Sequence, residues 1–387
     1  MIIEPKVRGF ICTTAHPEGC KAAVNSQIAV AEKYAGKINA GKRALVIGGS
    51  TGYGLASRIA LAFGGGAATL NVMFERAAAG VRTATAGWYN TAAFEQAAEK
   101  KGLYAKSVNG DAFSKEIKER VIEIIKRDLG KVDAVVYSLA APRRTMPDGS
   151  VCNSVLKTVG ENFTNKTIDL RTGEVGEITV TPATPEEIDA TVKVMGGEDW
   201  ADWIAALTTA GALEEGALTL AYSYIGPKVT HPIYMNGSIG MAKRDLYYTA
   251  KAISKKYGVN ARVSVNKALV TQSSSAIPVV PLYISLLYKA MKKAGTHEGC
   301  IEQMCRLFSQ KLGVYDSEGY IRLDDLEMDE KIQKEVSEAW KAVNTQNLDE
   351  YADIAGYWDD FYKIFGFKFA DVDYSADVNA EAEIKEA

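Results

Sequence analysis

Short apolar runs alternate with helical patterns along the first 140 residues of the chain. The runs that begin at Arg43 and Thr69 are rich in β-branched residues and have the length of strands. Between them, apolar positions recur with the spacing of amphipathic helices. The series consists of a strand from Arg43, helix 53–63, a strand from Thr69, helix 90–102, strand 104–112, helix 114–130 and strand 133–140. This βαβ order predicts an α/β fold with a doubly wound parallel sheet.

The alternation stops after Ala141 and returns about 75 residues later. Residues 172–187 have the pattern of a hairpin, and residues 184–213 that of one or two helices. We therefore expect an insertion over the active site at 141–217. The core is expected to resume with strand 218–226, a helix from Ser238 to Tyr257 that Gly258 stops, and strand 261–266. The prediction is one elaborated domain, 1–387, whose residues 276–387 form a mainly helical extension with a fraying acidic end at 377–387.

The first chemical signal is the stretch "GGSTGYG", where Gly48, Gly52 and Gly54 lie between a predicted strand and helix. Glycines at this place let the backbone approach a pyrophosphate, which the amides of the helix N-terminus bind. Glu75 ends the next strand 21 residues after Gly54, where a carboxylate accepts hydrogen bonds from the adenosine ribose. It would repel a 2′-phosphate, so the sequence predicts a Rossmann fold that binds NADH. No lysine follows these glycines in the G-x-x-x-x-G-K-[ST] spacing of a P-loop, so the pattern does not indicate a P-loop ATPase.

Two further strand ends are candidates for the same cleft. Asp111 and Ala112 follow the third predicted strand, and Leu139 and Ala140 follow the fourth. In a doubly wound sheet, ligands bind outside the carboxyl ends of the strands. The first pair could flank the adenine and the second could line the cofactor cleft, although ordinary strand ends would look the same.

Two tyrosine–lysine pairs compete for the chemical role beside the cofactor. Tyr247 and Lys251 have the Y-x3-K spacing of short-chain dehydrogenases, while Tyr234 and Lys243 span the turn into the predicted helix. A nearby ammonium favours phenolate character in a tyrosine, whose free pKa is about 10. Helices on a parallel sheet run away from its carboxyl edge, so Lys251 would lie ~12 Å further from that edge than Lys243. This geometry favours Tyr234 and Lys243 and makes the other pair a packing or surface pair.

Composition excludes several other classes of protein. The net charge of −3 and the pI near 5.9 give no electrostatic footprint for nucleic acid. Five scattered cysteines and the lack of an apolar leader indicate the cytoplasm. The clusters at His16–Cys20 and His297–Cys305 lack paired zinc-ligand spacing, so no metal is expected. The apolar run 276–291 is too short to span a bilayer.

Several motifs together resemble the trans-2-enoyl-CoA reductase family, which includes the FabV-type enoyl-acyl carrier protein reductases. They are "GGSTGYG", "TAGWYN", "NGDAF", "YSLAAPRR", "VKVMGGEDW", "AYSYIGP", the Y-x8-K pair, "VNKALVTQSSSAIPVVPLY" and "HEGCIEQ". The resemblance implies that Tyr234 donates a proton, Lys243 anchors the cofactor and Tyr224 contacts the substrate. The cofactor contacts it implies are Gly48, Gly49, Ser50, Thr51, Gly52, Tyr53, Phe74, Glu75, Asp111, Ala112, Leu139, Ala140, Leu269, Val270 and Thr271.

The activity that the resemblance implies is NADH-dependent reduction of the carbon–carbon double bond of trans-2-enoyl thioesters. The thioester carrier would be CoA, as in crotonyl-CoA, or acyl carrier protein, and the pathway fatty acid synthesis or butyrate-type fermentation. We expect residues 277–287 to shape the acyl pocket, and Arg143 and Arg144 to be surface arginines unless they meet substrate phosphates. A monomer is expected. The alternatives are a carbonyl dehydrogenase that uses Tyr247 and Lys251, and a non-catalytic dinucleotide sensor.

Overall fold

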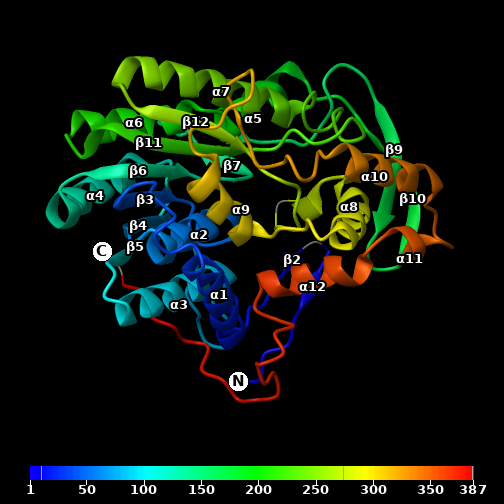
Figure 1. Ribbon diagram of the computed structural model, residues 1–387, viewed down its shortest axis with the longest axis horizontal. Helices are drawn as coiled ribbons and strands as arrows, with labels where there is room; N and C mark the ends of the chain where they lie inside the picture. Colours follow the sequence, from blue (N-terminus) through cyan, green and yellow to red (C-terminus); the bar gives the residue numbers. More distant parts are fainter. Residues whose placement is uncertain (10, 273, 386) are drawn as a thin grey trace.

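The centre of the molecule is a seven-stranded parallel sheet (Figure 1). The computed structural model describes residues 1–9, 11–272, 274–385 and 387. The strands follow the order β13-β12-β11-β6-β3-β4-β5, and every neighbouring pair is parallel. Their bounds are β3 Arg43–Ile47, β4 Ala68–Met73, β5 Ala105–Asn109, β6 Val132–Tyr137, β11 Leu213–Ser223, β12 Asn260–Val265 and β13 Ile321–Arg322. This order confirms the predicted doubly wound α/β fold.

The sheet is buried on both faces, which explains its nearly continuous apolar strands. Along β3, Leu45 and Ile47 face one layer of helices while Ala44 and Val46 face the other. The first layer contains α4 (Lys115–Ile124), α6 (Glu198–Thr209) and α7 (Ser238–Tyr257). The second contains α1 (Pro17–Glu32), α2 (Gly52–Ile59), α3 (Ala86–Lys100) and α9 (Cys300–Arg306). The sheet is therefore packed between two layers of helices, one on each face.

A long excursion separates β6 from β11. It begins with the short pair β7 (Arg143–Thr145) and β8 (Val151–Asn153) and continues into an antiparallel hairpin, β9 (Phe163–Asp169) and β10 (Glu174–Val180). Two helices follow, α5 (Pro185–Met195) and α6; a capping box between Thr184 and Glu187 begins α5. The sequence pattern located the second hairpin strand and the helices, but β11 begins at Leu213, five residues before the predicted strand.

The C-terminal third is mainly helical. Figure 1 shows α8 (Val280–Ala294), α10 (Glu330–Ala342), α11 (Leu348–Tyr351) and α12 (Ile354–Ile364) gathered beside the sheet with the β9–β10 hairpin. These elements share one hydrophobic core. The same third also returns to the sheet, because α9 packs on α2 and β13 adds the seventh strand. Sequence analysis did not predict β13, which has only two residues.

The prediction that residues 377–387 fray is wrong for the part that is described; Glu386 lies outside it. The tail runs back along α3 to the edge of the sheet (Figure 1). The amide of Ser107 in β5 donates to the Lys385 carbonyl (3.2 Å), and the Ala387 amide donates to the Ser107 carbonyl (3.1 Å). The tail thereby covers the exposed edge of β5, where unpaired backbone groups would otherwise face solvent.

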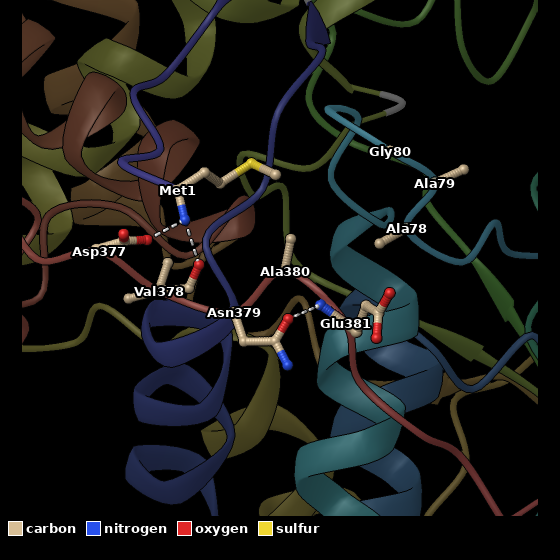
Figure 2. Close-up of a pocket in the computed structure, with 9 residues that line it drawn as sticks. All are labelled: Met1, Ala78, Ala79, Gly80, Asp377, Val378, Asn379, Ala380 and Glu381. Carbon is tan, nitrogen blue, oxygen red and sulfur yellow. Dashed lines mark hydrogen bonds and ion pairs between the residues drawn. The ribbon is translucent and has the colours of Figure 1, made fainter.

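The start of the chain meets the beginning of this tail. The Met1 ammonium group forms an ion pair with Asp377 and donates to the Val378 carbonyl (2.6 Å). Figure 2 shows these groups around a hollow of about 370 Å³, which Ala78 and Gly80 close on the other side. None of the helices in the described residues is both long enough and apolar enough to cross a membrane.

Candidate active site

A cavity of about 1120 Å³ lies at the carboxyl ends of the parallel strands. With the exception of Gly49, every site residue that the family resemblance implied lines this cavity. Those residues are Gly48, Ser50, Thr51, Gly52, Tyr53, Phe74, Glu75, Asp111, Ala112, Leu139, Ala140, Tyr224, Tyr234, Lys243, Leu269, Val270 and Thr271. Gly49 lies behind the wall, where its amide donates to Asn71 Oδ1 (3.0 Å). The fold therefore brings together residues that follow six strands, β3, β4, β5, β6, β11 and β12, with residues of the helices α2 and α7.

The glycine loop between β3 and α2 has no room for side chains at two positions. Gly48 has φ 86°, and a Cβ there would lie 2.3 Å from the Ser138 carbonyl oxygen. A Cβ on Gly54 would lie 2.0 Å from the Gly48 carbonyl oxygen. Thr51 precedes α2, and its side chain makes no capping hydrogen bond among the described residues. The first amides of α2 consequently face the cavity, where they can bind an anionic pyrophosphate.

Glu75 follows β4 at the same edge and is fixed by its neighbours. Ser50 Oγ donates to Glu75 Oε1 (2.7 Å), while the Asn109 side chain bonds the Glu75 amide (2.8 Å) and carbonyl (3.0 Å). Phe74 beside it is 79% exposed, which leaves an aromatic face open at the cavity mouth. A fixed carboxylate beside the glycine loop suits the two hydroxyls of an adenosine ribose and disfavours a 2′-phosphate there.

Lys243 lies in the first turns of α7 and points back toward the carboxyl edge of the sheet. Its Nζ donates to the Tyr222 carbonyl oxygen at the end of β11 (3.0 Å). Burial lowers the pKa of Lys243 to about 8. Tyr234 precedes α7 in a tight turn, and Gly240 allows the close approach, since a Cβ there would lie 2.3 Å from the Tyr234 carbonyl oxygen. The turn thus places tyrosine and lysine on the wall of one cavity.

Tyr224 stands next to Tyr234 in this wall. The two rings meet edge to face, with centroids 4.7 Å apart and an interplanar angle of 78°. Burial, and then the Glu327 carboxylate, raise the pKa of both phenols above the ordinary value. Both hydroxyls are therefore neutral donors at physiological pH rather than phenolates.

Tyr247 and Lys251 lie elsewhere on α7. The Lys251 ammonium sits over the Tyr247 ring, 4.1 Å from its centroid. Tyr247 also stacks on Tyr320 (4.6 Å) and donates to the Glu318 carbonyl oxygen. Neither residue lines the cavity at the carboxyl edge. This arrangement matches the packing role that the helix direction predicted.

Arg144 is not a surface arginine, so that expectation is wrong for one of the two arginines. It is 3% exposed, donates to the Lys193 carbonyl (2.9 Å) and lies 3.5 Å from Glu198. Its guanidinium also lies over the Phe113 ring. Arg144 thus ties the β7–β8 excursion to α5 and α6, whereas Arg143 is exposed.

The histidines of the two histidine–cysteine clusters, His16 and His297, make capping and packing contacts. His16 caps α1 by accepting the Gly19 amide at Nδ1 (3.2 Å). His297 packs against Tyr288, with ring centroids 4.4 Å apart. Among the described residues, no group of three or more His, Cys, Asp or Glu side chains could hold a metal ion.

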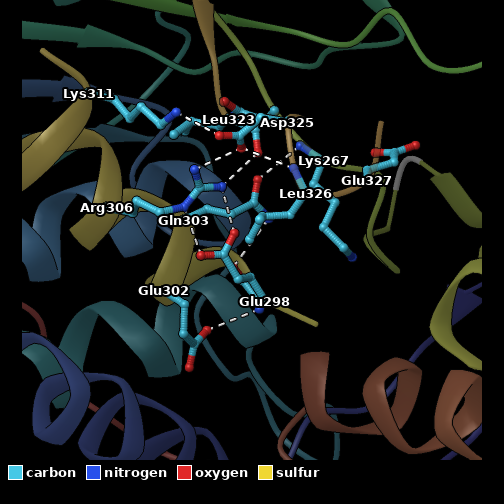
Figure 3. Close-up of polar contacts among 12 residues, drawn as sticks. Lys267, Glu298, Glu302, Gln303, Arg306, Lys311, Leu323, Asp325, Leu326 and Glu327 are labelled. Atoms are coloured by element: carbon cyan, nitrogen blue, oxygen red, sulfur yellow. Dashed lines mark hydrogen bonds and ion pairs between the residues drawn. The ribbon is translucent and has the colours of Figure 1, made fainter. Parts of the chain in front are cut away.

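Several residues around the cavity went unnoticed in the sequence. The Tyr53 hydroxyl donates to the Lys267 carbonyl (2.7 Å) and lies 3.1 Å from Gln303 Oε1, which also accepts the Lys267 amide (2.9 Å). Figure 3 shows how α9 presents Gln303 and Arg306 to the loops that follow β12 and β13. Only the motif "HEGCIEQ" hinted at this helix, and nothing in it indicated which side chains turn inward.

A tyrosine and a lysine that line the same cavity as a glycine loop and a carboxylate at a strand end form the arrangement typical of a dinucleotide-dependent oxidoreductase. Comparison with known families narrows this class. Residues 82–313 match the family model "Trans-2-enoyl-CoA reductase catalytic region", and residues 2–80 match "NAD(P)H binding domain of trans-2-enoyl-CoA reductase". The chain belongs to the trans-2-enoyl-CoA reductase family, as its motifs suggested.

Individual relatives agree over the whole length. The chain is 54% identical to a trans-2-enoyl-CoA reductase [NADH] of Ruminiclostridium cellulolyticum, over all of this chain and 99% of the relative. It is 56% identical to an enoyl-[acyl-carrier-protein] reductase [NADH] of Flavobacterium johnsoniae, with the same coverage. The solved structure of Treponema denticola trans-2-enoyl-CoA reductase in complex with NAD matches with a TM-score of 0.95, 49% identity and 99% of each chain covered.

A third model, "Enoyl reductase FAD binding domain", matches residues 315–378. In this chain the segment is mainly α10, α11 and α12, packed on α8 and the β9–β10 hairpin. Within its described residues it has no strand, glycine loop and helix of the kind that binds a dinucleotide pyrophosphate. Six of its residues, from Asp360 to Ala370, line the rim of the large cavity. These residues do not suit a flavin dinucleotide.

Proposed function

We propose that this protein reduces trans-2-enoyl thioesters to saturated acyl thioesters with NADH. The observation that carries the proposal is the cavity at the carboxyl edge, which Tyr234 and Lys243 line together with the glycine loop and Glu75. The family membership and the NADH-dependent relatives support the same activity. When bound, NADH supplies a hydride from nicotinamide C4 to the β-carbon of the substrate.

The cofactor would lie along the strand ends in the usual orientation for this fold. The amides of Gly52 and Tyr53 would bind the pyrophosphate, and Glu75 the adenosine ribose. Asp111 and Ala112 would flank the adenine, whereas Leu139 and Ala140 would line the path toward the nicotinamide. Phe74 and the segment Leu269, Val270 and Thr271 complete the proposed contacts, with Lys243 on the nicotinamide ribose.

Tyr234 and Tyr224 would act on the substrate carbonyl group. Hydride addition to the β-carbon drives negative charge onto the thioester carbonyl oxygen, and a hydrogen-bond donor placed there stabilises the resulting enolate. Tyr234 would donate to this oxygen, with Tyr224 as a second substrate contact, while the Lys243 ammonium adds positive charge nearby. The α-carbon then receives a proton from tyrosine or water, so that one hydride and one proton are added in total.

The carrier and the acyl pocket can be proposed from the cavity walls. Crotonyl-CoA is the test substrate, and either CoA or acyl carrier protein would hold the thioester in the cell. Ile277, Val280 and Ile284 line the cavity from the start of α8, where they would contact the acyl chain. We further propose a cytoplasmic monomer with no nucleic-acid partner, acting in fatty acid synthesis or butyrate-type fermentation.

The domain description also remains a proposal. We treat residues 1–387 as one elaborated domain with segment 141–217 over the site and residues 276–387 as its extension. The link that supports this is Trp203 of α6, whose Nε1 donates to the Ala112 carbonyl beside the cavity (3.1 Å). The excursion and the core are therefore joined by buried contacts, which include this hydrogen bond.

The alternatives differ in what they predict for one assay. NADH oxidation is followed with crotonyl-CoA and, separately, with a saturated ketone or aldehyde. The proposed function requires turnover of the first substrate and loss of that turnover in Tyr234→Phe. A carbonyl dehydrogenase would reduce the second substrate and depend on Lys251, and a dinucleotide sensor would bind NADH without turning over either.

A further inference from the structure

Glu327 is a buried acid behind the substrate-side tyrosines that the mechanism above does not use. It follows β13, the last strand of the sheet, and its side chain is 0% exposed. Three donors meet its carboxylate. The Tyr224 hydroxyl (2.9 Å) and the Tyr283 hydroxyl (2.6 Å) donate to Oε1, and the Ala268 amide donates to Oε2 (2.7 Å).

The surroundings of Glu327 contain no ion-pair partner. Within the described part of the chain, no lysine or arginine nitrogen lies within the 4.0 Å of a salt bridge from this carboxylate. The groups that face it are Tyr224 and Tyr234 after β11, Tyr283 on α8, Lys267 after β12 and Asp324 on its own loop. Burial raises the pKa of Glu327, and the hydrogen bonds from Tyr283 and Ala268 oppose that rise. Burying a carboxylate without an ion-pair partner lowers the stability of the fold, so the presence of Glu327 here indicates a role other than stability.

The loop that holds Glu327 is fixed on both sides. Arg306 of α9 donates to the Leu323 carbonyl (2.8 Å) and to Asp325 (2.8 Å), and Glu298 in turn holds Arg306 (2.7 Å). Figure 3 shows this network between α9 and the residues just before Glu327. On the other side, Gln333 of α10 donates to the Glu327 carbonyl (2.8 Å). These contacts hold the loop in place, so the Glu327 carboxylate can orient the side chains that donate to it.

Tyr224 has one hydroxyl proton, and that proton is given to Glu327. The bond fixes the χ angles of Tyr224, whose ring meets the Tyr234 ring at 4.7 Å. We propose that Glu327 is a positioning residue for the reduction, which sets the direction of the Tyr224 hydroxyl and, through the ring contact, the place of Tyr234. This inference rests on the proposed function of the two tyrosines. Glu327 itself does not line the cavity.

A double-mutant cycle tests the inference on the full chain. The variants are Glu327→Ala, Tyr224→Phe and the double variant, assayed for kcat/KM with crotonyl-CoA and for NADH binding by fluorescence. If Glu327 acts through Tyr224, Glu327→Ala lowers kcat/KM by roughly tenfold or more in the wild-type background, the worth of a charge-assisted hydrogen bond. In the Tyr224→Phe background the same change has an effect of less than about twofold, because the partner hydroxyl is already absent.

Two further variants keep the test decisive. Glu327→Gln preserves the side-chain volume. The backbone N–H of Ala268 needs an acceptor, so the Gln side-chain oxygen is expected to point toward Ala268. The Gln NH2 group then points toward Tyr224 and Tyr283, where it donates to the Tyr224 hydroxyl instead of accepting from it. Glu327→Gln replaces Glu327→Ala in the cycle if the alanine variant does not fold. Tyr283→Phe removes the other hydroxyl on Oε1 and is expected to cost less than about threefold, the lower range for a single hydrogen bond.

The outcomes separate this inference from the proposed function. Equal losses from Glu327→Ala with and without the Tyr224 hydroxyl, or no loss in the wild-type background, would overturn the positioning role. A parallel loss of NADH affinity would also overturn it, since that indicates a general structural effect. A wild-type protein that fails to reduce crotonyl-CoA would instead refute the proposed function.

Discussion

Tyr234 and Tyr224 meet edge to face, with ring centroids 4.7 Å apart, although one precedes α7 and the other follows β11. Both tyrosines line the cavity that the glycine loop also lines. The Y-x3-K pair, Tyr247 and Lys251, does not line this cavity. Spacing along a helix describes one face of that helix, whereas this site is built where a turn meets a strand end.

The two lysines of α7 should differ sharply in their importance. Lys243→Ala is expected to lower kcat/KM for crotonyl-CoA by roughly 10- to 100-fold, the worth of a charge-assisted hydrogen bond to the cofactor. Lys251→Ala is the matched control, since its ammonium only covers the Tyr247 ring. Initial rates of NADH oxidation measure both. A larger loss in Lys251→Ala would favour the carbonyl-dehydrogenase interpretation.

Glu75 should set the choice of nicotinamide nucleotide. The wild type is expected to prefer NADH, and Glu75→Ala should move the ratio of kcat/KM values toward NADPH by roughly tenfold or more, because a like-charge contact with the 2′-phosphate is removed. Rates with both nucleotides at equal crotonyl-CoA concentration measure the ratio. Preference of the wild type for NADPH would show that the Glu75 assignment is wrong.

The pKa of Lys243 should appear in the pH profile. Burial lowers this pKa to about 8, so the ammonium of the free enzyme is lost as the pH rises through that value. The kcat/KM for NADH should therefore fall above pH 8, because kcat/KM reports the free enzyme. Lys243→Ala should lack this descending limb at its lower overall rate.

A second buried lysine provides the control for that profile. Burial also lowers the pKa of Lys267 to about 8, but its Nζ donates to the Ala268 carbonyl (3.0 Å). Lys267→Met is expected to keep the descending limb. If the descending limb disappears in Lys267→Met and persists in Lys243→Ala, the titrating group is Lys267, which would contradict the assignment to Lys243.

The stability of the sheet edge should depend on Arg58. Its guanidinium is fully buried, 3.5 Å from Glu95, and donates to the Lys106 carbonyl (2.9 Å). Arg58→Met leaves the Glu95 carboxylate buried and unpaired, which should cost about 3–5 kcal/mol of unfolding free energy. Thermal unfolding measures the loss, and the double variant Arg58→Met with Glu95→Met should recover part of it. An unchanged midpoint in Arg58→Met would contradict this account.

Local backbone chemistry made much of the fold and site predictable. Gly48, Glu75 and the end of α7 at Gly258 each follow from what a strand end or helix end requires, so one sequence was enough. Glu327 could not be found this way, because it lies in "LDDLEMDE", an acidic run that resembles a solvated surface. The surroundings of Arg144 could not be predicted for a similar reason, since its ion-pair partner Glu198 lies more than fifty residues later in the sequence. Long-range packing leaves no local pattern.

The central claim is that Tyr234, rather than Tyr247, serves the reduction. The most direct test is the initial rate of NADH oxidation with crotonyl-CoA by the wild type, Tyr234→Phe and Tyr247→Phe, with NADH affinity measured alongside. Tyr234→Phe should lower kcat by about 10²-fold or more, the usual worth of a general acid, while NADH still binds. Tyr247→Phe should remain close to the wild type. Normal turnover by Tyr234→Phe, or its loss in Tyr247→Phe, would contradict the account.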